Sequence, residues 1–249
     1  WWETDLHRTL KELRITGGEP LMSADTWKLI DWFKENRGKS TTRLAINSNL
    51  GPNIDIDRLI ASVDGLDMDI YTSNEAVGAQ AEYIRDGLDY DQWMKNIVKV
   101  IESKQFRGVH VMCTVNALCL DSLPEFLDQL VELKKQYGKD YPNFTLNILR
   151  FPSFQSALIL PDDIRTQYKN NLINWLDKHR AQDYMHEHEI NHVIRLIDYL
   201  DVVKTPHSEA FDMPKLHNDF KEFYSQYDVR RNKEFATAFP ALANWYNTL

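Results

Sequence analysis

Cysteine is scarce in this sequence: among 249 residues only Cys113 and Cys119 carry a thiol. Both lie within VMCTVNALCL, in and just after a predicted apolar strand. A reduced cysteine in such a place ordinarily acts as a small buried hydrophobe. Two thiolates cannot complete the four-thiolate set that holds an iron–sulfur cluster. We therefore interpret both cysteines as core residues.

Long apolar runs and an excess of basic residues are also absent. No stretch approaches the roughly 18 uncharged apolar residues of a membrane span, and we expect no signal peptide before the predicted fold. The 29 Lys and Arg residues are outnumbered by 37 Asp and Glu residues, which gives a net charge of −8. A general nucleic-acid surface needs clustered Lys and Arg. We therefore expect a cytoplasmic protein with neither a nucleic-acid nor a membrane partner.

Strand-like and helix-like patterns alternate along the first two thirds of the chain. Short apolar runs precede stretches with helical spacing, as with Trp27, Ile30 and Phe33 in SADTWKLIDWFKENRG. This rhythm predicts right-handed crossovers and a mostly parallel sheet. In such folds the loops that leave the carboxyl ends of the strands build the site. The predicted strands are 13–16, 42–47, 66–72, 109–115 and 144–150.

From about residue 183 the alternation stops and helical patterns such as HEINHVIRLIDYLDVV dominate. We predict an α/β core over 1–182 and a helical C-terminal extension over 183–249. The last segment, FKEFYSQYDVRRNKEFATAFPALANWY, is rich in aromatic and basic residues. We interpret it as helices that pack on the core, and docking of a substrate or partner is the alternative.

The loop TGGEP at 16–20 follows the first predicted strand. It is neither a Walker loop nor a dinucleotide fingerprint, because it lacks both spacings. Gly17 and Gly18 allow positive φ and close approach of a ligand, and Pro20 favours an extended Glu19. The loop therefore offers carbonyl and carboxylate oxygens, which accept hydrogen bonds and suit an ammonium group. On this chemistry alone, a purely structural tight turn is an equal alternative.

ITGGEPLM closely resembles the GGEP motif of the radical S-adenosylmethionine (radical SAM) enzymes. In that family the motif follows the second strand of a partial (β/α)6 barrel and binds the methionine amino group of the cofactor. Later segments agree in order over about residues 10–160. YTSNEAVGAQAEYIRDGLDYDQWMKNI, in particular, is similar to the fourth-strand region of members with SPASM or twitch extensions. The resemblance implies an α/β partial barrel, with strands two to six present, and a helical tail.

The resemblance also implies a cofactor site built from strand ends. Ser73 and Arg85 occupy the positions that hold the cofactor carboxylate, and Asn116 the position that faces its ribose. The alternatives are a turn or cap role for Ser73 and a surface salt bridge from Arg85 to Glu82 or Asp86. The implied cofactor-binding residues are Gly17, Gly18, Glu19, Pro20, Asn47, Ser73, Arg85 and Asn116.

The implied activity is reductive cleavage of S-adenosylmethionine to a 5′-deoxyadenosyl radical, which abstracts hydrogen from a substrate. It requires a [4Fe-4S] cluster and an external one-electron reductant. Twitch-type members modify peptides or proteins, so the resemblance implies a substrate of that kind. It identifies no catalytic residue and no reaction type.

The family's cluster motif, C-x3-C-x2-C, does not occur, because no cysteine precedes residue 113. Residues 3–11 resemble the end of the helix that follows the cluster loop. We expect the cluster ligands upstream of Trp1, so that this chain alone is inactive, and we assign no metal ligand within it. The alternative is natural loss, which leaves a non-catalytic barrel that binds S-adenosylmethionine or a peptide.

HEINH at 188–192 matches the H-E-x-x-H pattern of zinc proteases. Such a protease needs a third ligand and a different fold around the helix. The apolar positions Ile190, Val193 and Ile197 explain the segment as an amphipathic helix with a solvated face. We favour that interpretation, and a zinc protease is the minor alternative.

Overall fold

The computed structural model describes residues 2–202 and 212–249. Residues 203–211 of the predicted extension, and Trp1, lie outside the described residues. The chain divides into two compact units, and the prediction of a boundary near 183 remains a prediction. The first unit comprises Trp1–Ser73, Asp91–Met112 and Glu132–Phe144, and the second comprises Asn74–Tyr90, Cys113–Val131 and Thr145–Leu249.

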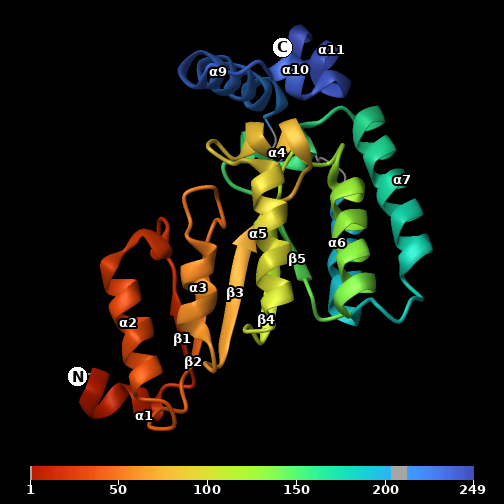
Figure 1. Cartoon of the computed structure of the whole chain (residues 1–249). Helices are drawn as coiled ribbons and strands as arrows, with labels where there is room; N and C mark the ends of the chain where they lie inside the picture. The colour runs from red at the N-terminus through yellow and green to blue at the C-terminus, as the bar shows by residue number, and fades with distance from the viewer. Residues whose placement is uncertain (1, 203–211) are drawn as a thin grey trace. The chain divides into compact units, whose positions relative to one another are not determined.

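Five strands form one parallel sheet whose order in space follows the sequence, β1-β2-β3-β4-β5 (Figure 1). A barrel winds in this sequential order, whereas a doubly wound sheet reverses direction at a switch point. The α/β prediction is confirmed, and the sheet is consistent with a partial barrel. Each strand begins and ends within two residues of its predicted position. The strands are β1 (Glu12–Ile15), β2 (Arg43–Asn47), β3 (Met68–Ser73), β4 (Gly108–Val115) and β5 (Asn143–Ile148).

Helices follow the strands as the sequence patterns predict, with one addition. A short helix that the sequence patterns do not predict, α4 (Gly78–Ile84), lies between β3 and α5. No described helix is long and apolar enough to cross a membrane. The other elements are η1 (Trp2–Leu6), α1 (His7–Thr9), η2 (Pro20–Met22), α2 (Ala24–Glu35), α3 (Ile56–Val63), α5 (Tyr90–Ser103), α6 (Leu123–Tyr137), η3 (Ser153–Gln155), η4 (Ala157–Ile159), α7 (Asp162–His179), α8 (Glu187–Leu200), α9 (Met213–Arg231), α10 (Phe235–Ala238) and α11 (Pro240–Thr248).

In the first unit, helices cover one face of the strands. The Ser23 hydroxyl accepts a hydrogen bond from the Asp25 backbone N–H and so starts α2. On α5, Trp93 is fully buried and its indole N–H donates to Thr72 Oγ1 of β3 at 2.9 Å. Because side chains alternate along a strand, the residues on either side of Thr72 point to the opposite face.

That opposite face of β1–β4 is polar and partly exposed, and we call it the open face. Parallel sheets are normally buried on both sides by apolar residues, so charged side chains here need partners or a ligand. Its polar and aromatic residues are Glu12 and Arg14 of β1, Arg43 and Asn47 of β2, Asp69, Tyr71 and Ser73 of β3, and His110 and Thr114 of β4.

The aromatic residues of the C-terminal segment pack within the second unit. The Tyr83 hydroxyl of α4 donates to Asp228 of α9 at 2.6 Å, and Tyr227 donates to the Tyr83 carbonyl at 2.8 Å. The rings of Phe235 and Tyr246 stack with centroids 4.0 Å apart. These contacts account for the aromatic composition of the segment through packing.

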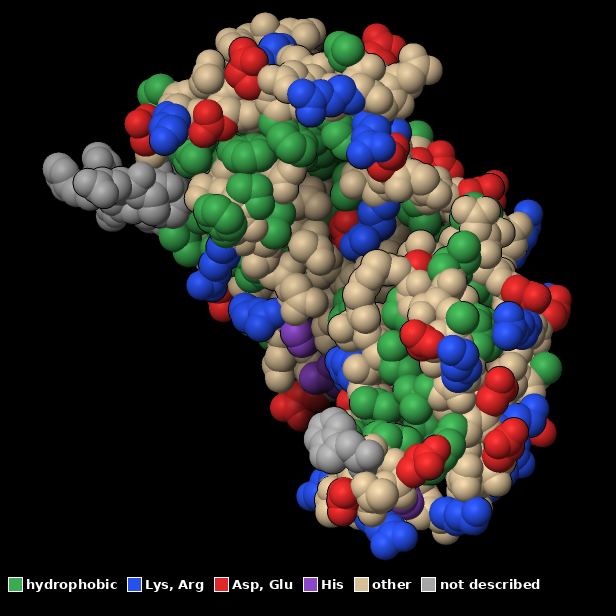
Figure 2. Space-filling model, turned by 90° about the vertical axis from the view of Figure 1, so that its left-hand side faces the viewer, with side chains coloured by type: hydrophobic (Ala, Val, Ile, Leu, Met, Phe, Trp, Pro, Cys, Tyr) green, Lys and Arg blue, Asp and Glu red, His purple; other side chains and the backbone are tan. Residues whose placement is uncertain are grey.

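Charged side chains of both signs are interspersed over the face drawn in Figure 2. Lys and Arg residues do not gather there into one extended patch among the described residues. This distribution agrees with the net charge of −8. It gives that face no footprint for a polyanion.

Candidate cofactor-binding site

The turn after β1 leaves its backbone accessible. Gly17 has φ +134°, a conformation that L residues rarely adopt. A Cβ atom added at Gly17 or Gly18 would meet no described atom within 4 Å, so open space borders this edge of the chain. Glu19 is extended, with φ −126° and ψ 102°, and Pro20 opens η2. The local geometry is the one that the residue types predict.

Both carboxylate oxygens of Glu19 accept hydrogen bonds from backbone N–H groups. Oε1 accepts from Leu21 at 3.1 Å, and Oε2 accepts from Asn49 at 2.7 Å. Glu19 thus ties the turn after β1 to the loop after β2. A carboxylate can accept about four hydrogen bonds, so capacity for a ligand donor remains. The acid therefore has a structural task that the sequence did not reveal.

Asn47 ends β2, and its side chain carries an unsatisfied acceptor. Oδ1 is buried and has no hydrogen-bond partner within the described part of the chain. Leaving a buried acceptor unpaired costs about 1–3 kcal/mol, which a ligand donor would offset. The bond from Asn49 to Glu19 brings the loop that begins at Asn47 next to the glycine turn.

Ser73 is the last residue of β3 and is half-buried. The register pairs Asn47 with Tyr71, so Ser73 lies one step along the open face beyond Asn47. The structure thus brings the turn at 17–20, Asn47 and Ser73 to one edge of the sheet, formed by the carboxyl ends of β1–β3.

Arg85 lies in the second unit, at the end of α4, and pairs with Glu75. Its Nη2 is 2.6 Å from Glu75 Oε2, and the Glu75 side chain is only 2% exposed. Asp86, an alternative partner considered for Arg85, instead forms ion pairs with Arg231 at 2.9 Å and Lys233 at 3.1 Å. Arg85 Nε is buried and finds no hydrogen-bond acceptor in the described residues. Arg85 is therefore held in place and keeps an unused donor.

Glu75 is the residue that sequence reasoning missed. Its Oε2 also accepts from the Thr114 N–H at 3.2 Å, so it joins Arg85 to the end of β4. The available signal was an acid three residues after a predicted strand end, in SNEAVG. The spacing of residues in the sequence does not show which groups such an acid will bind in the fold.

Asn116 follows β4 and builds a local turn. Its amide N–H donates to the Thr114 carbonyl at 3.1 Å, and its Oδ1 accepts from Leu118 at 2.9 Å. Arg85, through Glu75, and Asn116 therefore meet at Thr114. The predicted ribose contact of Asn116 remains a prediction.

The two cysteines are free and fully buried, as predicted. Burial raises the pKa of the Cys113 thiol and of the Cys119 thiol. Thiolates are the metal-binding form, so both residues are poor ligands. Across 2–202 and 212–249, no three His, Cys, Asp or Glu side chains form a group that could hold a metal ion. These residues do not fit an iron–sulfur cluster.

The HEINH segment lies in the first turns of α8, and its side chains make contacts that stabilise the fold. Glu189 is fully buried and accepts from the His186 N–H at 3.0 Å, which forms a capping box. His192 Nδ1 lies 3.0 Å from the Leu146 carbonyl of β5. The acid of the motif therefore caps its helix, and the described residues give the zinc-protease alternative no support.

No family model matches the chain. A stretch of 91 residues is 33% identical to GTP 3′,8-cyclase from Staphylococcus carnosus, and it covers 34% of this chain and 27% of the cyclase. The match thus spans about a quarter of that relative. A solved structure, native anSMEcpe with bound AdoMet and Cp18Cys peptide, is similar with a TM-score of 0.43 and 14% identity, over 95% of this chain and 86% of that chain.

Proposed function

We propose that this chain is the cofactor-binding part of a radical SAM enzyme that modifies a peptide or protein. The observation that carries the proposal is the GGEP turn at the carboxyl end of β1, held by Glu19 beside the unpaired Oδ1 of Asn47. The 91-residue similarity to GTP 3′,8-cyclase, itself a radical SAM enzyme, supports it. The second candidate is a non-catalytic barrel that binds S-adenosylmethionine or a peptide.

In this proposal the first unit holds the ammonium group of S-adenosylmethionine. The carbonyls of Gly17 and Gly18 and the Oδ1 of Asn47 accept its N–H groups, while the Glu19 carboxylate supplies a favourable negative potential. Since Glu19 is fixed by two backbone N–H groups, the turn needs little reorganisation on binding. That rigidity lowers the entropic cost of holding the cofactor.

The cofactor carboxylate is assigned to the Ser73 hydroxyl and the Arg85 guanidinium. Glu75 takes one edge of that guanidinium, which leaves Nε as the donor toward a ligand. A carboxylate on the second edge would satisfy this buried N–H. Glu75 thus acts as a positioning residue for Arg85.

When bound and reduced by one electron from an external reductant, S-adenosylmethionine would supply the radical chemistry that abstracts a hydrogen atom from the substrate. The chain's own contribution is to bind the cofactor, fix its orientation and exclude water. The described residues offer no ligand set for a [4Fe-4S] cluster, so no step here is assigned to one.

The proposal is tested by equilibrium binding of S-adenosylmethionine to this chain and to Gly17→Ala. A Cβ at this positive φ costs about 1–2 kcal/mol of stability and also intrudes on the open edge. We expect at least about tenfold weaker binding, or a loss of 1.4 kcal/mol. Gly138→Ala is the matched control, since Gly138 has φ +104° and an equally open surrounding. Equal binding by the two variants would contradict the assignment.

Catalysis is tested on the protein that contains this chain, by anaerobic reconstitution with iron and sulfide and a chemical reductant. Formation of 5′-deoxyadenosine is the result expected of an enzyme. Binding of S-adenosylmethionine without that product favours the non-catalytic barrel.

A further inference from the structure

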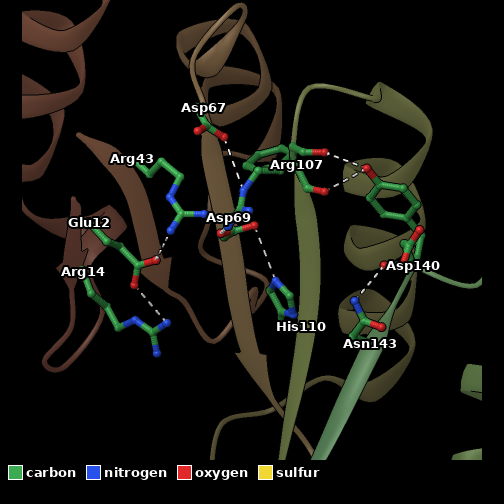
Figure 3. Close-up of polar contacts among 11 residues, drawn as sticks. Glu12, Arg14, Arg43, Asp67, Asp69, Arg107, His110, Asp140 and Asn143 are labelled. Atoms are coloured by element: carbon green, nitrogen blue, oxygen red, sulfur yellow. Dashed lines mark hydrogen bonds and ion pairs between the residues drawn. The ribbon is translucent and has the colours of Figure 1, made fainter. Parts of the chain in front are cut away.

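The open face carries two arginines that share one carboxylate. Arg14 Nη2 is 3.2 Å from Glu12, and Arg43 Nη2 is 4.0 Å from the other oxygen of the same residue (Figure 3). The two arginine side chains are 41% and 40% exposed. In the part of the chain that is described, neither has a second carboxylate partner. The trio by itself carries one net positive charge, while Arg107 beside it is shared by two carboxylates, Asp67 and Asp69.

The Arg14 guanidinium packs over an aromatic ring. Its guanidinium carbon lies 4.1 Å from the centroid of the Tyr71 ring. Tyr71 in turn stacks on the His110 ring, with centroids 4.4 Å apart and planes 18° apart. A cation over an aromatic face is attracted by the ring. This contact restrains the position of the Arg14 guanidinium on the open face.

The neighbouring acids of the open face are engaged elsewhere. Asp69 is buried and binds Arg107, and its other oxygen lies 3.5 Å from His110 Nε2. Asp67 binds the same arginine, with 3.3 Å between Oδ1 and Nε (Figure 3). These contacts leave Glu12 as the acid that Arg14 and Arg43 share.

The geometry points to an oxyanion-binding subsite formed by Arg14 and Arg43, which receives a carboxylate or phosphate group of the substrate. Two guanidiniums that share one carboxylate keep N–H donors for a second oxyanion, and arginine matches the planar fork of a carboxylate or phosphate. Arg14 lies three residues before Gly17 on the strand that leads into the glycine turn. The assignment to a substrate rests on the proposed function, whereas the binding of an oxyanion does not.

The test uses the chain labelled with ¹⁵N at arginine, and follows the Nε–Hε signals of Arg14 and Arg43 by NMR. Inorganic phosphate and acetate are titrated separately at constant ionic strength, because phosphate and carboxylate groups are both possible. We expect saturable shifts of these two signals with millimolar affinity. Arg14→Gln and Arg43→Gln should abolish saturation, whereas Arg8→Gln, an exposed arginine of α1, should not.

A further variant measures how strongly the negative charge of Glu12 opposes oxyanion binding. Glu12→Gln should tighten oxyanion binding about fourfold, the Coulomb effect of one charge at about 5 Å in water. Saturation by phosphate alone would identify a phosphate subsite, and saturation by both probes would extend it to carboxylates. Shifts that persist in the Arg14→Gln, Arg43→Gln double variant, or that never saturate, overturn the proposal.

Addition of S-adenosylmethionine separates this proposal from the proposed function. If the cofactor binds and phosphate still shifts the two signals, both proposals are supported. If phosphate binds but the cofactor does not, the subsite stands and the proposed function fails. If the cofactor itself shifts both signals and blocks phosphate, the arginines hold its carboxylate, and a separate substrate subsite is overturned.

Discussion

At the scale of the residue, Glu19 and Asn47 illustrate two ways in which a polar group can serve a site. The carboxylate oxygens of Glu19 accept hydrogen bonds from the backbone N–H groups of Leu21 and Asn49, and these bonds fix the shape of the turn. Asn47 keeps its Oδ1 buried and unpaired in the described structure. The first arrangement raises stability, and the second lowers it. Substitutions at the two positions should therefore change stability and binding in different combinations.

Glu19→Gln should lower both the stability of the fold and the affinity for S-adenosylmethionine. One backbone N–H would then face an amide NH2 group, which cannot accept its hydrogen bond. The expected loss is about 1–3 kcal/mol in the free energy of unfolding, measured by urea denaturation. Glu35→Gln, on the exposed end of α2, is the control for a change of charge alone. Unchanged stability would show that the two hydrogen bonds contribute nothing.

Asn47→Ala should separate binding from folding. Removal of an unpaired buried acceptor should leave the unfolding free energy unchanged, or raise it by up to about 1 kcal/mol. Affinity for S-adenosylmethionine should fall about fivefold to tenfold, because one charge-assisted hydrogen bond is lost. Calorimetric titration and urea unfolding on the same samples measure the two effects. A variant that loses stability but binds normally would assign Asn47 a purely structural role.

At the scale of the element, the five strands could be predicted because each is a short segment with apolar residues at least at alternate positions, and this pattern is local in sequence. The glycine turn could be predicted for the same reason. Helix α4 could not be predicted, because it is stabilised by contacts between residues that are distant in sequence. Its Tyr83, for example, donates a hydrogen bond to Asp228, which is 145 residues away. The Glu19–Asn49 bond spans 30 residues, and the Arg85–Glu75 pair depends on how α4 ends. Such contacts leave no periodic pattern in the sequence.

The pairing of β3 with β4 predicts a pH-dependent stability through Asp69. Burial alone would raise the pKa of this carboxyl, but hydrogen bonds from His110 and Arg107 outweigh it, and the pKa is lowered. The stabilisation is therefore present above the carboxyl's unfolded pKa, about 4, and is lost as pH falls through the lower folded value.

Asp69→Asn is expected to be less stable than the natural chain at pH 7 by about 2 kcal/mol. The difference should shrink as pH falls below about 4, where Asp69 of the natural chain becomes protonated. Urea denaturation at a series of pH values measures this. Asp57→Asn is the control, since Asp57 is exposed and pairs with Lys99 on the surface. A gap that stays constant down to acid pH would refute the ionic role of Asp69.

At the scale of the whole molecule, binding of a cofactor is linked to the stability of the native state. The contacts proposed in the first unit are those of the glycine turn, Asn47 and Ser73, and the residues assigned in the second unit are Arg85 and Asn116. A cofactor that binds the native state stabilises it by about 2.7 kcal/mol at a hundredfold excess over the dissociation constant. The same free energy slows local opening wherever the bound segments must release the ligand before they open.

Hydrogen–deuterium exchange with and without S-adenosylmethionine should therefore show a distinctive pattern of protection. We expect slower exchange in 16–22 and 47–50 of the first unit and in 74–86 of the second, because these segments contain the proposed contacts. Helix α8 serves as the internal control, since its Glu189 and His192 are engaged in capping and in contacts to β5. Protection confined to the first unit would refute the assignment of Arg85 to the cofactor carboxylate. Protection of α8 alone would place the ligand elsewhere, since no proposed contact lies on that helix.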